Sequence, residues 1–311
     1  MYYEKILFAT TASPTCDNAA KVAFDMAAKY DAELVVFHVL GIPSRGFSTQ
    51  VQDVKTGDME EFYDDNYLAL VKEEIRSYYN GLMEGVDKVR IEVAAGVPST
   101  EILRLARKEE ADLIVMGSHN TDQDVTSTRY RSAAGATMRK VAKRARCPVA
   151  IISRPCTTCW KLFSNIVFAT DFSKAADSAF LYASKSAQAI GARLYLFHAY
   201  DLSASYGGGN APSQVEIEAR VTDAKLKMQE KYLSQLQGWD NWEVAIWEGT
   251  PYVEILKYAR DKQADLVVMA HHTREYADED EAEMGSTVEQ VVLRSPCPVA
   301  SVNHPDMVAG K

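Results

Sequence analysis

The residues with the clearest chemistry are a glycine, two hydroxyl side chains and one carboxylate in the second half of the chain. Gly285-Ser286-Thr287 opens a stretch of helical periodicity, and the free N–H groups and dipole of a helix start favour a bound phosphate. Asp171 follows an apolar run, where a carboxylate can accept hydrogen bonds from ribose hydroxyls. Together these residues suggest a nucleotide site. The alternative is an ordinary helix start with an N-cap hydroxyl.

The elements that position these residues occur twice in the chain. Five segments recur in the same order: 5–11 with 165–171, 32–38 with 192–198, 96–98 with 249–251, 111–116 with 264–269, and 147–150 with 297–300. The spacing falls from 160 to 150 residues because the loops shorten while the elements persist. This duplication predicts two homologous domains, 1–154 and 164–311, joined by a linker at 155–163.

Each half alternates short apolar runs with segments of helical period, a pattern that predicts an α/β fold. The expected strands of the second half are 165–170, 193–198, 242–247, 265–270 and 298–302. Near-continuous apolar strands between helices are typical of a parallel sheet covered on both faces. We therefore expect two tandem doubly wound domains, each with a five-stranded parallel sheet. Ligands of such sheets bind beyond the carboxyl ends of the strands.

Several motifs carry a family resemblance: Phe-Ala-Thr-Asp-Phe-Ser at 168–173, Val-Met-Gly-Ser-His at 115–119, Gly-Ser-Thr-Val at 285–288, and the Cys-Pro-Val-Ala endings. Through them nearly the whole chain resembles the universal stress protein family in its tandem form. The resemblance implies the strand order 3-2-1-4-5 in each domain. Some members bind ATP through Gly, two residues, Gly, nine residues, then Gly with Ser or Thr; others lack this pattern and do not bind ATP appreciably.

The first half departs from that pattern. It keeps Gly117 but has Asn120 at the second glycine, and fourteen residues separate Asn120 from Gly135. Ala136 replaces the hydroxyl residue, and Thr11 stands where the acidic residue belongs. The first half is therefore the weaker candidate.

The second half departs in a different way. Ala270 and Thr273 replace the two glycines, and a side chain there can block close approach of phosphate to the backbone. The eleven residues 274–284 carry six carboxylates, which would repel a triphosphate unless a metal such as Mg²⁺ intervened. Asp171 and Gly285-Ser286 survive, so the site is expected in this half.

The resemblance gives candidate residues for binding ATP or another adenine nucleotide in both halves. Those of the second half are Ala169, Thr170, Asp171, Ala199, Met269, Ala270, Thr273, Gly285, Ser286 and Thr287. Those of the weaker first half are Ala9, Thr10, Thr11, Val39, Met116, Gly117, Asn120, Gly135, Ala136 and Thr137.

Other reactive residues favour plainer roles. His38 and His198 end the second strand of each half, where a hydrogen-bonded histidine is favoured over a catalytic one. The pair His271-His272 would need a kinked loop to chelate, so no metal site is predicted. Cys156 and Cys159 lie in the linker, and a redox role for them stays open. Two further cysteines, Cys147 and Cys297, are expected to be buried structural thiols.

Composition narrows the function. The 311 residues carry a formal charge of −9 and five cysteines, which argues against nucleic-acid or anionic-membrane binding and favours a reducing cytosol. No apolar run is long enough to span a membrane, and the N-terminus lacks a secretory signal. We expect a cytoplasmic stress-response protein that senses a nucleotide, with at most weak ATP hydrolysis. The alternative is an interaction module with two relic pockets.

The last strands, 148–152 and 298–302, are apolar and lie at sheet edges under the family topology. Exposed edges attract partners, and the resemblance implies dimers through this strand. We expect the two halves to pair with each other as an intrachain pseudo-dimer. A homodimer and unidentified protein partners stay open.

Overall fold

The computed structural model describes residues 3–41, 50–52, 59–61, 65–118, 135–154, 163–201, 213–271 and 286–302. The chain divides into two compact units. The N-terminal unit is Tyr3–Val141, and the C-terminal unit is Ala142–Lys311 with Met1–Tyr2. Among the residues described, no helix is long and apolar enough to cross a bilayer.

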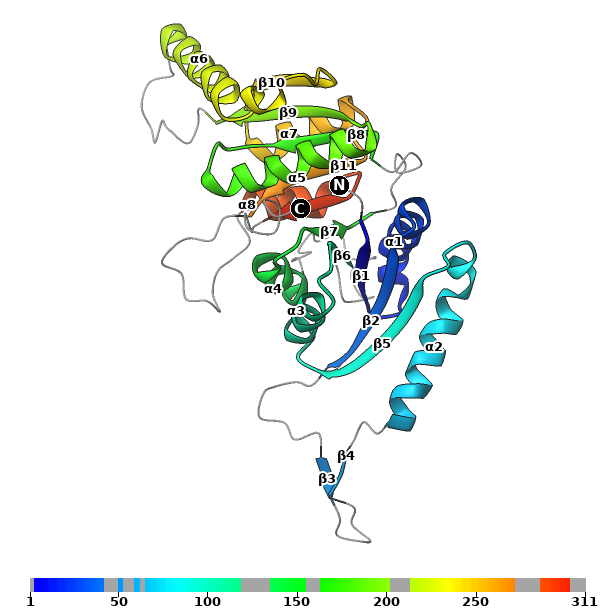
Figure 1. Cartoon of the computed structure of the whole chain (residues 1–311). Coiled ribbons are helices and arrows are strands. Elements are labelled where there is room, and N and C mark those ends of the chain that lie inside the picture. The colour runs from blue at the N-terminus through cyan, green and yellow to red at the C-terminus, as the bar shows by residue number, and fades with distance from the viewer. Residues whose placement is uncertain are drawn as a thin grey trace. The chain divides into compact units, whose positions relative to one another are not determined.

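The N-terminal unit is a parallel sheet between two helical layers. Its strands are β1 (Lys5–Thr10), β2 (Glu33–Gly41), β5 (Val89–Gly96) and β6 (Leu113–Gly117), in the order β5-β2-β1-β6. Figure 1 shows α1 (Asp17–Tyr30) and α2 (Asp65–Met83) on one face, and α3 (Pro98–Lys108) and α4 (Ala136–Arg144) on the other. A short antiparallel pair joins β3 (Gln50–Gln52) and β4 (Met59–Glu61). A 3₁₀ turn, η1 (Pro14–Cys16), precedes α1.

The C-terminal unit repeats this plan. Its strands are β8 (Asn165–Ala169), β9 (Arg193–Tyr200), β10 (Trp242–Glu248), β11 (Leu266–Ala270) and β12 (Val299–Val302), in the parallel order β10-β9-β8-β11-β12. The helices are α5 (Lys174–Ile190), α6 (Gln214–Lys231), α7 (Pro251–Asp261) and α8 (Ser286–Arg294), with a 3₁₀ turn, η5 (Leu233–Leu236), after α6. The predicted α/β class with a mostly parallel sheet is confirmed.

One strand of the C-terminal unit runs against the others. Strand β7 (Val149–Ile152) belongs by sequence to the first repeat, yet it falls within the C-terminal unit. It pairs with β12 in antiparallel register, with Val299 opposite Ile151 and Ser301 opposite Val149. Both strands are fully buried, so the apolar edge of β12 is covered.

Local signals in the sequence fix the helix limits. The Ser173 side chain accepts a hydrogen bond from the Ala176 N–H at the start of α5, and α6 begins with a capping box of Ser213 and Glu216. Helix α5 ends at Gly191 with φ 73°, a left-handed conformation that glycine adopts without strain.

A buried aromatic cluster fixes the end of the first strand in each unit. In the C-terminal unit the Tyr232 ring lies 5.2 Å from Phe168 and 4.7 Å from Phe180, and its hydroxyl is 2.9 Å from Thr170 Oγ1. In the N-terminal unit Tyr79 occupies the same place, with its hydroxyl 2.6 Å from Thr10 Oγ1. The cluster therefore holds the threonine from which the site loop begins.

A buried aspartate ties the first strand to the fourth in each unit. Asp265 is 2% exposed and accepts hydrogen bonds from the backbone N–H groups of Ser164 at 2.7 Å and Asn165 at 3.1 Å. Asp112 does the same for Glu4 and Lys5, both at 2.9 Å. These N–H groups lie at the starts of β8 and β1. Without the aspartates they would have no hydrogen-bond partner in the protein.

Each unit has an ion pair at the corresponding place, and the positions of the acid and the base are exchanged between the two units. Arg90 Nη2 of β5 lies 2.7 Å from Glu109 Oε2 after α3, whereas Glu243 Oε1 of β10 lies 2.7 Å from Lys262 Nζ after α7. Hydrogen bonds from Arg90 and Lys5 hold the pKa of Glu109 below its ordinary value. The exchange confirms that β5–α3 and β10–α7 correspond residue for residue.

Candidate functional site

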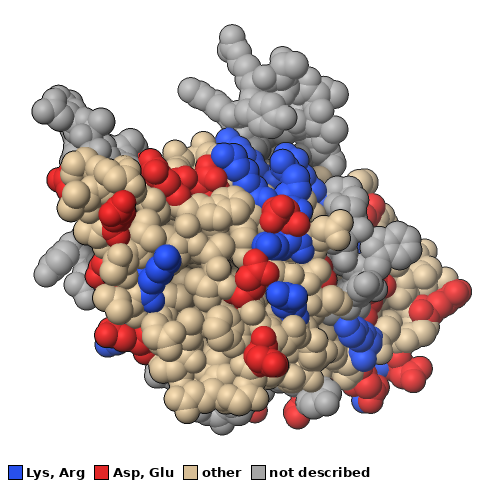
Figure 2. All heavy atoms as spheres, turned by 90° about the horizontal axis from the view of Figure 1, so that it is seen from above, with Lys and Arg blue, Asp and Glu red and all other residues tan. Residues whose placement is uncertain are grey.

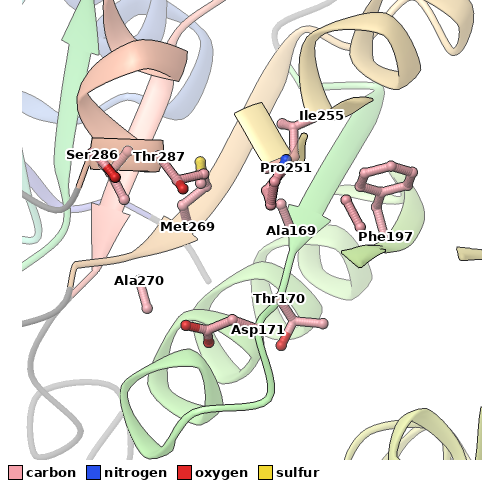
Figure 3. Close-up of a pocket in the computed structure, with 12 residues that line it drawn as sticks. Ala169, Thr170, Asp171, Phe197, Pro251, Ile255, Met269, Ala270, Ser286 and Thr287 are labelled. Carbon is pink, nitrogen blue, oxygen red and sulfur yellow. The ribbon is translucent and has the colours of Figure 1, made fainter. Parts of the chain in front are cut away.

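A cavity of about 270 Å³ opens at the carboxyl ends of β8, β9 and β11 in the C-terminal unit (Figure 3). After β8 and after β11 the chain turns toward opposite sides of the sheet. The cavity lies between these two strand ends, the place where ligands bind in doubly wound sheets. Its walls come from three strand ends and the first turns of α7 and α8. The lining residues are Ala169, Thr170, Asp171, Phe197, Ala199, Pro251, Ile255, Met269, Ala270, Ser286, Thr287 and Val288.

The structure brings together eight of the residues that the sequence proposes for this half: Ala169, Thr170, Asp171, Ala199, Met269, Ala270, Ser286 and Thr287. The other two, Thr273 and Gly285, lie outside the described residues. The sequence reasoning missed Phe197, Pro251, Ile255 and Val288. Two of these carried a usable signal, since Phe197 lies two residues before Ala199 on the same strand face and Ile255 lies one turn after Pro251.

The loop after β8 is held by its own side chains. The Phe172 N–H donates to Thr170 Oγ1 at 2.9 Å, and the Ser173 N–H donates to Asp171 Oδ1 at 3.0 Å. Phe172 has φ 63°, in the left-handed region, and Lys231 Nζ donates to its carbonyl at 2.9 Å. These bonds fix the exposed Asp171 carboxylate at the end of β8, where Figure 3 shows it on the side of Ala270.

His198 supports this loop from the neighbouring strand. Its Nδ1 lies 2.8 Å from the Thr170 carbonyl oxygen, and its ring lies 4.5 Å from the Phe172 ring. Burial lowers the pKa of His198, so the neutral ring donates from Nδ1 to the carbonyl. His38 Nδ1 lies 2.9 Å from the Thr10 carbonyl in the same way. The prediction that both histidines are hydrogen-bonded is confirmed, but neither ends its strand, because β2 continues to Gly41 and β9 to Tyr200.

We expect acid to destabilise the C-terminal unit through His198. The unfolded state binds a proton near the ordinary pKa of 6.5, whereas the folded state binds it only at lower pH. Stability is therefore full above about pH 6.5 and falls as the pH drops toward the folded pKa. Urea denaturation between pH 7.5 and 5 measures this slope, which the His198→Gln variant should reduce. An equal slope in both proteins would contradict the assignment.

One side of the cavity is the start of α8. Ser286 and Thr287 form its first turn and line the cavity, and the leading N–H groups of a helix have no partner within it. Figure 3 shows the Ser286 and Thr287 hydroxyls on this side, across the cavity from Phe197. Apolar walls therefore face a polar end that contains hydroxyls.

The corresponding cavity of the N-terminal unit is smaller, about 80 Å³. It brings together seven proposed residues, Ala9, Thr10, Thr11, Val39, Met116, Gly117 and Thr137, with four that the sequence reasoning missed, Cys16, Phe37, Pro98 and Ile102. Gly135 and Ala136 are described but do not line it. Asn120 lies outside the described residues.

Turn η1 explains part of the small size. A Cβ built on Gly117 would lie 3.2 Å from the Thr15 carbonyl oxygen and 3.8 Å from Cys16 Sγ. Thr11 Oγ1 lies 2.8 Å from Ser13 Oγ and 3.3 Å from Cys16 Sγ, so its hydroxyl is engaged by the turn. In the C-terminal unit α5 begins directly at Lys174, and Ala270 fits at the position of Gly117.

Comparison with known proteins settles the family. The model of the universal stress protein family matches the chain twice, over residues 2–153 and 162–303. The chain belongs to the universal stress protein family. The double match is that of a tandem universal stress protein, in agreement with the repeat.

Individual relatives agree with this assignment. A universal stress protein of Methanocaldococcus jannaschii is 30% identical over 159 residues, covering 49% of this chain and 84% of its own length. One from Thermus aquaticus is 33% identical over 141 residues, covering 45% of this chain and 99% of its own length. The solved structure of a universal stress protein from Archaeoglobus fulgidus covers 97% of this chain and 99% of its own, with 21% identity and a TM-score of 0.68, and shows the same fold.

Three of the remaining candidate residues of this universal stress protein are described, and all three are buried. Cys147 and Cys297 are buried as predicted, and burial raises the pKa of the Cys297 thiol to about 12. His271 is buried, whereas His272, Cys156 and Cys159 lie outside the described residues. Within the described ranges, no three His, Cys, Asp or Glu side chains are grouped to hold a metal ion.

The described surface carries charges of both signs. On the face in Figure 2, acidic and basic side chains lie interspersed.

Proposed function

We propose that the C-terminal unit binds one adenine nucleotide, such as ATP, and that the protein is a cytoplasmic nucleotide-sensing stress protein. The observation that carries this proposal is the joining of Asp171, at the end of β8, and Ser286, at the start of α8, in one cavity of about 270 Å³. A carboxylate for ribose and a helix start for phosphate are the two contacts that a nucleotide needs. Some members of the family bind ATP, which supports the same conclusion.

The cavity chemistry fits the parts of such a ligand. Ala169, Ala199 and Met269 offer an apolar surface to a base, because burying a flat ring against apolar groups is favourable. Asp171 offers oxygen acceptors to the ribose hydroxyls. Ser286 and Thr287 offer hydroxyl donors to phosphate, with the helix dipole adding to the attraction.

The N-terminal unit is proposed as the supporting copy. Its cavity is about 80 Å³, and its strand-end loop has Thr11 in place of the carboxylate. Mg²⁺ is the accompanying ion we propose, because it offsets the repulsion between the acidic residues 274–284 and phosphate. Hydrolysis of the nucleotide is proposed to be weak at most, since His198 is engaged with the Thr170 carbonyl rather than placed as a base.

The repeats are proposed to extend over 1–154 and 164–311 and to pair with each other through their last strands. The antiparallel ladder of β7 and β12 supports this intrachain pseudo-dimer, because it joins one strand of each repeat. A homodimer and further protein partners would use other surfaces. An interaction module without a ligand is the competing function, and it is favoured by Ala270, whose side chain reduces the approach of phosphate to the backbone.

We expect Asp171→Ala to weaken ATP binding about tenfold, the effect of losing hydrogen bonds to a charged acceptor. Calorimetric titration with ATP, with and without Mg²⁺, measures the change. The matched control is Thr11→Ala at the corresponding place of the first repeat, which should leave the affinity unchanged. Absence of heat with the wild-type protein at millimolar ATP would refute nucleotide binding.

A further inference from the structure

We infer that the N-terminal unit holds a second small-molecule site, between β5 and α3, that takes an aromatic carboxylate. This site is separate from the proposed nucleotide cavity and does not depend on it. A cavity of about 280 Å³ lies there. Phe37, Ala94 and Leu105 form its apolar wall, and Lys108 lies on its helical side.

The cavity uses its own face of α3. Its helical wall is formed by Glu101, Arg104, Leu105 and Lys108, which recur at intervals of three and four and so share one side of the helix. The small cavity at the carboxyl ends of the strands is instead bounded by Pro98 and Ile102. The two cavities share only Phe37, from the sheet beneath α3.

Aromatic side chains occupy the corresponding space in the second repeat. The residues that correspond to Ala94 and Leu105 are Trp247 and Tyr258, at the spacing of 153 residues that also relates Gly96 to Gly249. In the C-terminal unit the Tyr258 ring stacks on Phe197 at 4.5 Å, and the Trp247 ring lies 5.5 Å from Phe197 and 5.1 Å from Tyr258. These three rings form a packed cluster between β9, β10 and α7.

The N-terminal unit keeps the base of that cluster and lacks the rest. Phe37 corresponds to Phe197, but alanine and leucine replace the other two rings. Ala94 and Leu105 are only half-buried, so the space they leave is open to solvent. An aromatic molecule in this cavity would pack against Ala94 and Leu105, with the 3% exposed Phe37 beneath them, and would replace contacts that Trp247 and Tyr258 supply in the other copy.

Lys108 gives the rim of the cavity a positive charge. Glu92 is already paired, with Lys72 Nζ at 3.3 Å and Arg90 Nη1 at 3.1 Å, and Glu101 pairs with Arg104. Lys108 stands where the second repeat has Asp261, so one acid of that copy is a cation here. A carboxylate on the ring would meet Lys108 at the rim.

The test is a titration of the full chain with indole-3-acetate, observed by ligand NMR or calorimetry. A ligand of this size should bind with a dissociation constant of about 1 mM or below. Ala94→Trp, which installs the ring of the second repeat, should abolish binding, and Leu105→Tyr provides a second variant of the same kind. Lys108→Asp should weaken binding of indole-3-acetate about tenfold and leave that of neutral indole unchanged. Lys21→Asp, on the opposite helical layer, is the charge control.

The site is distinguished from the nucleotide cavity by one further variant. Ala199→Trp fills the cavity of the C-terminal unit and should leave indole-3-acetate binding intact. Loss of binding in Ala94→Trp with retention in Ala199→Trp supports the second site whether or not ATP binds. Absence of binding to the wild-type protein, or the opposite pattern of losses in folded variants, would overturn it.

Discussion

Replacing Asp265 by alanine should lower the free energy of unfolding of the C-terminal unit by about 3 kcal/mol. The carboxylate is 2% exposed and accepts two backbone N–H groups at the start of β8, from Ser164 at 2.7 Å and Asn165 at 3.1 Å. Alanine removes both acceptors. The N–H groups then lose charge-assisted bonds at a place with little access to water, which costs more than a lost surface contact.

Urea denaturation followed by tryptophan fluorescence measures this loss, because Trp239, Trp242 and Trp247 all lie in the C-terminal unit. Asp223→Ala is the matched control. Asp223 is exposed and pairs with Lys227 within one helix at 2.7 Å, so its removal should cost about 0.5 kcal/mol or less. Equal losses in the two variants would show that Asp265 does not tie β8 to β11.

Replacing Ala199 by tryptophan should lower the affinity for ATP about 100-fold or more, because the indole ring would fill much of the proposed cavity. Ala199 lies at the end of β9, is half-buried and lines the cavity of about 270 Å³. A large side chain can therefore enter the cavity without displacing the fully buried layer of Leu196 and Phe197. The expected result is a folded protein without measurable affinity for ATP.

Val39→Trp is the matched control for this variant. Val39 occupies the corresponding place on β2 and lines the smaller cavity of the N-terminal unit. Because that unit is proposed to be the supporting copy, filling its cavity should leave the affinity for ATP unchanged. Thermal unfolding of both variants separates lost binding from lost folding. Retained binding in Ala199→Trp would place the nucleotide elsewhere.

Much of this architecture could be predicted from sequence because the signals are local. The apolar run before Asp171 and the helical period after Ser286 set the ends of β8 and the start of α8. Strand ends of a parallel sheet meet at one edge, so these residues had to converge. The sequence predicts a hydrogen-bonded His198, and its bond to the Thr170 carbonyl agrees, although β9 continues to Tyr200.

Other features depend on tertiary packing and could not be predicted from one segment. The small size of the first cavity follows in part from the Thr15 carbonyl, which η1 brings to 3.2 Å from the Cβ position of Gly117. Pro251 and Val288 enter the second cavity because α7 and α8 both begin at its rim. Such contacts join segments distant in sequence, where hydrophobic periodicity carries no information.

The duplication explains why one fold carries unequal cavities. Paired residues have changed together, as in the exchanged charges of Arg90–Glu109 and Glu243–Lys262. Elsewhere the two copies differ in side-chain size. Trp247 and Tyr258 fill a space in the second repeat that stays open beside Ala94 in the first. Two copies of a scaffold therefore present two different sets of binding surfaces.

The number of nucleotides bound per chain shows directly whether one repeat, both or neither binds ATP. Equilibrium dialysis of the full chain against labelled ATP with Mg²⁺ gives this number without reference to any variant. We expect one ATP per chain, bound in the C-terminal unit. Two bound nucleotides would contradict the inequality of the repeats, and none at millimolar ATP would contradict nucleotide binding altogether.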